Sequence, residues 1–103
     1  MKGNFNKLIN GDKPVLIDFH ALWCGPCKSQ SPIISEVAKK AKGKARVSKI
    51  DIDKNQSIAQ RFKVMGVPTL MFFKNGEVVW RASGVQSQTK LMGVIEELSL
   101  IHI

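Results

Sequence analysis

Both cysteines of the 103-residue chain lie in the segment WCGPCK (residues 23–28), between a predicted strand and a predicted helix. The strand is the nearly continuous apolar run from Val15 to Phe19, which has the pattern of a strand covered on both faces. The helix begins at Pro26, because the missing N–H and the fixed φ of proline are harmless in a first helical turn. The chain must therefore fold around a strand–helix unit that carries two sulfur atoms where the helix starts.

The spacing of Cys24 and Cys27 in this context favours redox chemistry. Unpaired N–H groups at the start of the helix, together with the positive end of its dipole, stabilise a thiolate at Cys24. Two intervening residues bring the sulfur of Cys27 back beside that of Cys24, so the two can form an intramolecular disulfide.

Other uses of a cysteine pair fit this sequence less well. A zinc site needs two more ligands, and the only histidines are His20, beside the motif, and His102, in the C-terminal tail. Covalent haem attachment needs a histidine directly after the second cysteine, where Lys28 stands. A purely structural disulfide across so small a loop would restrict the unfolded chain little. We therefore expect a redox pair and no metal.

The rest of the chain alternates between helical and strand patterns. Strand patterns cover Val47–Ile52, Thr69–Phe73 and Glu77–Ala82. Helical patterns cover Asn4–Ile9 and a segment from Pro26 to near Gly43. Two further helical segments follow, one around Ile58 capped by Asp53 or Asn55 and a last one capped by Ser87. Asn75-Gly76 between two apolar runs predicts a β-hairpin. Strands that alternate with helices imply a parallel pair, and the hairpin adds antiparallel strands. We therefore expect an α/β fold with a mixed sheet and helices on both faces.

The composition excludes several classes of protein. Hydrophobic residues make up 44% and charged residues 23%, which is typical of a compact globule, and the length fits one domain covering residues 1–103. The apolar runs are too short to span a membrane, and the N-terminus lacks the apolar stretch of a secretory signal, so we expect a cytoplasmic protein. The net charge is +8, but the densest basic run, residues 39–46, contains no aromatic side chain. We therefore expect acidic partners and no nucleic acid.

Several motifs in combination resemble the thioredoxin family. The segment WCGPCK matches the family's signature; the matching flanks are the strand Val15–Asp18, the cis-proline loop Gly66–Thr69, the hairpin Lys74–Glu77 and the glycine Gly84. The likeness runs from residue 5 to residue 98. It implies a thioredoxin-like three-layer α/β sandwich and a protein-disulfide reductase that acts by dithiol–disulfide exchange.

The resemblance also implies catalytic roles for matching residues. Cys24 would attack a substrate disulfide, and Cys27 would resolve the mixed disulfide and leave a Cys24–Cys27 bond. Asp18 would be buried, which raises its pKa, and would accept the proton of Cys27. Lys49 matches the family's lysine that faces this carboxylate.

A docking surface for substrates beside the disulfide is a further implication of the resemblance. A cis peptide bond at Pro68 would present the backbone of Val67 to an extended substrate segment. No tightly bound cofactor is implied, and electrons would come from NADPH through a flavoprotein thioredoxin reductase. The apolar surface around the disulfide would comprise Trp23, Gly25, Pro26, Val67, Pro68, Gly84 and Val85.

Two other functions stay open at the level of sequence. One is a disulfide oxidase or isomerase of an oxidising compartment, although the Gly-Pro pair between the cysteines resembles reducing members of the family. The other is a binding module of the same fold, which would use the apolar rim and could dispense with the thiols. A redox potential distinguishes the first alternative, and a variant without thiols distinguishes the second.

The chain departs from the family's pattern at two places. His20 stands where the family usually has an aromatic residue, and we expect it to titrate near the motif and to change the pH dependence of activity. Only 14 residues precede Val15, too few for the family's usual first strand in addition to a helix. We therefore predict four strands, with Val47–Ile52 at an edge of the sheet. We expect a monomer, with a dimer formed through this exposed edge as the alternative.

Overall fold

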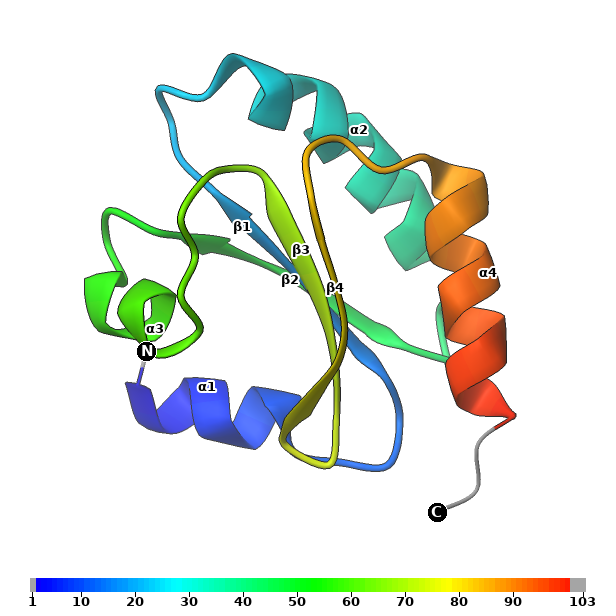
Figure 1. Ribbon diagram of the computed structural model, residues 1–103. Helices are drawn as coiled ribbons and strands as arrows, with labels where there is room; N and C mark the ends of the chain where they lie inside the picture. Colours follow the sequence, from blue (N-terminus) through cyan, green and yellow to red (C-terminus); the bar gives the residue numbers. More distant parts are fainter. Residues whose placement is uncertain (1, 101–103) are drawn as a thin grey trace.

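The computed structural model describes residues 2–100 of the protein. Along the chain these residues form α1 (Lys2–Ile9), β1 (Val15–His20), α2 (Gly25–Lys40), β2 (Arg46–Asp51), α3 (Gln56–Arg61), β3 (Thr69–Lys74), β4 (Glu77–Ser83) and α4 (Gln88–Ser99), as Figure 1 shows. This is the order predicted from the sequence, with boundaries within a few residues. No helix in the described range combines the length and the apolar character that crossing a membrane requires.

The four strands form one mixed sheet in the order β2-β1-β3-β4. β1 pairs with β2 in parallel and with β3 antiparallel, and β3 and β4 form an antiparallel hairpin. The prediction of a mixed sheet of four strands with β2 at an edge is therefore confirmed. Because β1 is central and its register sets Asp18 beside Lys49 of β2, the strand that leads to the cysteines is held on both sides.

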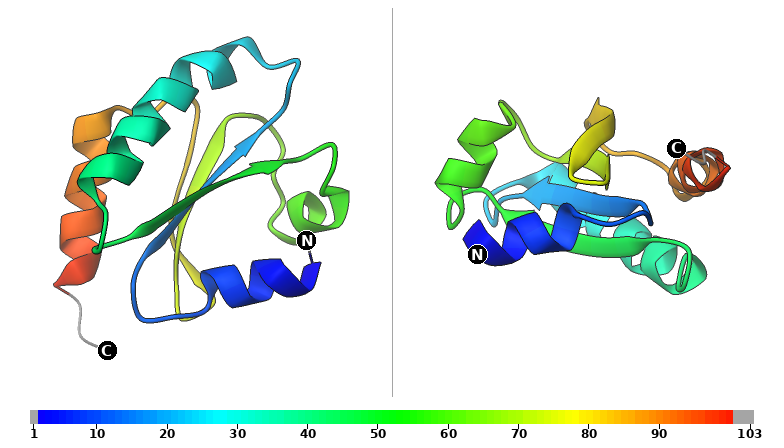
Figure 2. Two further views of the ribbon diagram at one scale, coloured as in Figure 1. Left: turned by 180° about the vertical axis from the view of Figure 1, so that it is seen from behind. Right: turned by 90° about the horizontal axis from the view of Figure 1, so that it is seen from below.

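Helices cover both faces of the sheet and bury two separate hydrophobic clusters (Figure 2). The alternation of side chains along β1 divides them: Leu16 points into the cluster with α2 and α4, whereas Val15, Ile17 and Phe19 point into the cluster with α1 and α3. β1 reads as a continuous apolar run because both of its faces are covered. Asp18 is two residues from Leu16, so it lies on the face covered by α2.

The turns follow the sequence signals, with one exception. Asn75 and Gly76 both have positive φ (53° and 81°), which is the conformation that a tight two-residue hairpin turn requires. Ser87 caps α4 by accepting a hydrogen bond from the N–H of Lys90 at 3.1 Å. Asn55 precedes α3 as predicted, but its side chain does not cap the helix. Its amide donates instead to the carbonyl of Asp51 at 3.0 Å and tightens the loop after β2.

Candidate active site

The two cysteines lie where β1 ends and α2 begins, and they are joined by a disulfide with a Cα–Cα distance of 5.3 Å. Cys24 is the N-cap residue of α2, and its Sγ accepts a hydrogen bond from the backbone N–H of Cys27 at 3.1 Å. The backbone N–H of Cys24 closes the preceding turn onto the carbonyl of Ala21 at 3.2 Å. This geometry directs an otherwise unpaired N–H at the start of a helix toward the first sulfur. Such an N–H stabilises negative charge on sulfur when the pair is reduced.

The loop before β3 packs directly against the disulfide. Val67 contacts the small buried cluster formed by Ala21, Cys24 and Cys27, and the Val67–Pro68 peptide bond is cis, as predicted. Pro68 itself is buried, so the expectation that its ring forms part of an exposed apolar surface is wrong. Val67, by contrast, is half-buried at the edge of the disulfide.

The segment after β4 completes the surroundings of this loop. Gly84 donates its N–H to the carbonyl of Pro68 at 2.9 Å, and its φ of +84° favours glycine. Val85, next in the chain, is 45% exposed. The predicted residues of the cis-proline loop and of the segment after β4 are therefore joined to each other by a backbone hydrogen bond.

Trp23 stands beside the disulfide as a large exposed apolar side chain. Its indole is 69% exposed, and the indole N–H donates to a carboxylate oxygen of Asp53 at 2.9 Å. A charge-assisted bond of this kind restricts the rotamers that an exposed ring can adopt. Gly25 and Pro26, which follow Cys24, are also exposed. The surface next to the sulfur atoms is apolar and partly ordered.

Asp18 is a fully buried carboxyl group beneath α2. Neither of its oxygens has a hydrogen-bond partner within the described part of the chain. Burial raises the pKa of Asp18, and the positive charges of His20 and Lys49 oppose this shift in part. A carboxyl group with a raised pKa is a better proton acceptor than an exposed one when it is ionised.

Lys49 lies beside Asp18 in the register of β2 with β1, on the same face of the sheet. Its ammonium group donates to the hydroxyl of Ser31 on α2, and neither oxygen of Asp18 accepts from it. The lysine therefore acts on the carboxyl group through its charge and not through an ion-pair contact. His20 ends β1 two residues further along and is half-buried.

Comparison with known proteins gives a family for this arrangement. Residues 1–97 match the family model described as Thioredoxin. The chain is 43% identical to a thioredoxin from Rickettsia felis over 91 residues, which cover 88% of this chain and 87% of that protein. It is 48% identical to a thioredoxin from Staphylococcus saprophyticus over 82 residues, 80% of this chain and 79% of that protein. The chain belongs to the thioredoxin family.

A solved structure supports the thioredoxin fold independently. A mutant thioredoxin from Halobacterium salinarum superimposes with a TM-score of 0.88 at 36% identity, covering 98% of this chain and 88% of that one. The protein is thus a thioredoxin-fold α/β protein with a redox-active Cys24–Cys27 disulfide, and it is a protein-disulfide reductase. Thioredoxins carry no bound cofactor, because the disulfide is itself the redox group.

Four residues beside the thioredoxin disulfide were not predicted as part of the site. Leu22 and Met65 are apolar side chains that are 73% and 93% exposed, next to Trp23 and two residues before Val67 in the chain. Asp53 holds Trp23, and Gln30 is fully buried within α2. The one usable signal in the sequence is position, since Leu22 and Met65 are apolar residues directly next to recognised motifs.

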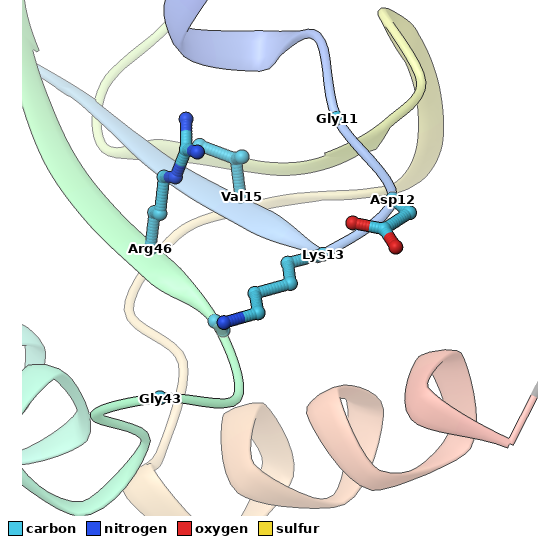
Figure 3. A pocket seen from close by; sticks show the side chains of 7 residues that line it. Gly11, Asp12, Lys13, Val15, Gly43 and Arg46 are labelled. Carbon is cyan, nitrogen blue, oxygen red and sulfur yellow. The ribbon is translucent and has the colours of Figure 1, made fainter.

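Within the described residues, neither a metal site nor the pocket reported below is part of the site around the disulfide. Among residues 2–100, no three or more His, Cys, Asp or Glu side chains are placed to hold a metal ion, and His102 lies outside the described residues. A pocket of about 200 Å³ lies at the opposite end of β1 from the cysteines. Figure 3 shows Lys13 reaching across it toward the segment before β2, while Arg46 points to α1, where it donates to the carbonyl of Leu8 at 3.4 Å.

Proposed function

We propose that Cys24 and Cys27 divide the reductase reaction between an attacking and a resolving thiol. The thiolate of Cys24 attacks a substrate disulfide, breaks its S–S bond and releases one substrate thiolate, which takes up a proton. Cys27 then loses its proton and attacks the Sγ of Cys24, which forms the Cys24–Cys27 disulfide and releases the second substrate thiolate, and this thiolate takes up a proton. Two electrons pass to the substrate in this sequence. The observation that carries the proposal is the N–H of Cys27 directed at the sulfur of Cys24.

In this scheme Asp18 receives the proton of Cys27. Its burial on the α2 face and its raised pKa support the role, because a buried carboxylate is a stronger base than an exposed one. Lys49 moderates that basicity through its charge, since it lies beside Asp18 in the sheet register and favours the ionised carboxylate. Neither residue needs to touch the substrate.

Protein disulfides dock on the surface next to the sulfur atoms. The backbone of Val67 pairs with an extended substrate segment, while the cis bond to Pro68 sets its orientation. Exposed apolar groups that are held in place support this role, since they lose little mobility on binding. The surface comprises Trp23, Gly25, Pro26, Val67, Gly84 and Val85, with Pro68 beneath it.

The resemblance to thioredoxins also supports proposals about the setting of the reaction. Electrons come from NADPH through a flavoprotein thioredoxin reductase, and the protein works in the reducing cytoplasm, where a reductase has a supply of electrons. We propose likewise that the chain forms a single domain. The protein is a monomer at working concentrations, because the exposed Arg46 and Lys49 on the free edge of β2 oppose pairing with a second copy. Sedimentation at high concentration tests the last point, and a dimer there would contradict it.

The test of the mechanism is insulin reduction with dithiothreitol as the electron source. We expect turbidity well ahead of the reagent-only control for the wild type, and no acceleration for Cys24→Ser. Cys27→Ser should trap a mixed disulfide with the substrate. A wild type no faster than the control overturns the reductase mechanism. An equilibrium potential against glutathione in the oxidising range would favour an oxidase or isomerase, and full biological function of the double Cys→Ser variant would favour a binding module.

A further inference from the structure

Gln30 is a buried polar side chain that the reaction scheme leaves without a role. It lies on α2 one helical turn after Cys27 and is fully inaccessible to solvent. Its amide group makes two hydrogen bonds to the backbone of one residue, Gln86. The Nε2 of Gln30 donates to the carbonyl of Gln86 at 3.0 Å, and the N–H of Gln86 donates to the Oε1 of Gln30 at 2.6 Å. The side chain thus pairs with the backbone as a strand residue would.

The residue that Gln30 holds belongs to the segment beside the disulfide. Gln86 follows Val85 directly and lies in the connection between β4 and α4, which runs beside α2 in Figure 1. Two residues earlier, Gly84 donates to the carbonyl of Pro68 at 2.9 Å. A continuous set of hydrogen bonds therefore runs from the helix that carries Cys27, through Gln30 and residues 84–86, to the cis-proline loop.

We propose that Gln30 is a positioning residue that sets the distance between the redox helix and the docking surface, and so the affinity for protein disulfides. The inference rests on the docking role assigned above to Val67, Gly84 and Val85. Glutamine suits the position because its amide both donates and accepts, as pairing with one backbone unit requires. A shorter amide would not reach, and an apolar side chain would leave both Gln86 groups without this partner.

The effect of losing this contact falls on docking and not on the chemistry of the sulfur atoms. Without Gln30, residues 84–86 sample more conformations and must be ordered again when a protein substrate binds. A small disulfide that reaches Cys24 without touching this segment does not bear that cost. Two hydrogen bonds are lost, but other contacts still hold residues 84–86, so we take the ordering cost on binding as that of about one ordinary hydrogen bond, which corresponds to about a three- to tenfold change in an equilibrium constant. KM for a protein disulfide should rise by that factor, with kcat and the redox potential nearly unchanged.

The experiment compares two substrates and three variants. Initial rates are measured with insulin and with cystine, using dithiothreitol as the electron source and subtracting the reagent-only rate. Gln30→Met keeps the apolar volume and removes both hydrogen bonds. Gln60→Met is the matched control, since Gln60 is an exposed glutamine in α3. We expect Gln30→Met to raise KM for insulin about three- to tenfold, with cystine kinetics and redox potential as in the wild type, and Gln60→Met to change none of these.

Gln30→Glu keeps the inference testable if Gln30→Met fails to fold. A protonated carboxyl group has the donor and acceptor of the amide, whereas the carboxylate can only accept. The KM of Gln30→Glu for insulin should therefore approach the wild-type value in mild acid and exceed it in mild alkali. Two results would overturn the positioning role alone. One is a ratio of variant KM to wild-type KM that is the same for insulin and for cystine in every variant; the other is an insulin KM for Gln30→Glu that equals the wild-type KM at all pH values. A wild type inactive on both substrates would overturn the proposed function itself.

Discussion

Replacing Asp18 with asparagine tests the claim that a buried, unpartnered carboxyl group lowers the stability of the protein. Asparagine has nearly the same shape, so the change removes a charge and leaves the packing beneath α2 intact. In the wild type both carboxylate oxygens lie in the interior without a hydrogen-bond partner in the described residues. A buried polar group in this state costs about 1–3 kcal/mol, and more when it is charged. The amide of asparagine is also unpaired there, so the gain is the extra cost of burying the charge, and we expect Asp18→Asn to raise the free energy of unfolding by at least about 1 kcal/mol at neutral pH.

The increase in the free energy of unfolding of Asp18→Asn over the wild type must depend on pH in a defined direction. Burial raises the pKa of Asp18 in the folded protein, so between the ordinary pKa of an aspartate and the raised one the folded state holds a proton that the unfolded state releases. The stability of the wild type therefore falls as pH rises through this window and stays low above it. Asp18→Asn lacks this proton. The difference between the two proteins should be small in acid, grow through the window and become constant above the raised pKa.

Urea unfolding of both oxidised proteins across this pH range measures the difference directly. Each kcal/mol corresponds to about 4–8 °C in Tm for a domain near this size, so thermal unfolding gives a second measure. Asp12→Asn is the matched control, because Asp12 is exposed. A wild type at least as stable as Asp18→Asn at every pH would refute the reasoning. The variant should also resolve mixed disulfides more slowly, since the proton of Cys27 has lost its acceptor.

The charges around the site yield three smaller predictions. His20→Trp removes a positive charge that opposes the raised pKa of Asp18, so the pH profile of insulin reduction should move to higher pH; superimposable profiles would contradict this. Lys49→Ala should move the profile in the same direction, whereas Lys49→Arg should keep it in place. Asp53→Asn removes the charged acceptor of the Trp23 indole, so the indole N–H should exchange faster with water in NMR spectra, with KM for insulin raised about two- to tenfold. An unchanged exchange rate would show that the bond does not order the ring.

Much of the fold could be predicted because its signals are local. The run from Val15 to Phe19, the Asn75-Gly76 turn and the cap at Ser87 each specify backbone conformation within a few residues, and the structure confirms all three. The described residues form a sheet of four strands, which is the number predicted. Asn55 was the exception, because asparagine can bond either forward into a helix or backward into a loop, and local sequence does not decide between them.

The site was predictable where the motif is continuous and not where it depends on contacts across the fold. The disulfide and the cis bond before Pro68 follow from short segments, but the burial of Pro68 depends on how its loop packs. Gln30 meets a backbone unit 56 residues further along the chain, and Asp53 meets Trp23 across 30 residues. No periodicity or spacing in the sequence predicts these contacts, since the polar side chains of Gln30 and Asp53 could equally well be exposed to solvent.

The sheet separates Asp18 and Gln30 from an aromatic cluster on its other side. The rings of Phe5, Phe62 and Phe73 meet at centroid distances of 5.1–5.8 Å in the layer of α1 and α3. Asp18 lies on the opposite face, beneath α2, and Gln30 belongs to α2 itself. This partition has a practical use in protein engineering. The aromatic layer can be redesigned for heat tolerance, or exchanged with that of another member of the family, provided that Ile52 is kept, because it packs against both this layer and the cysteines.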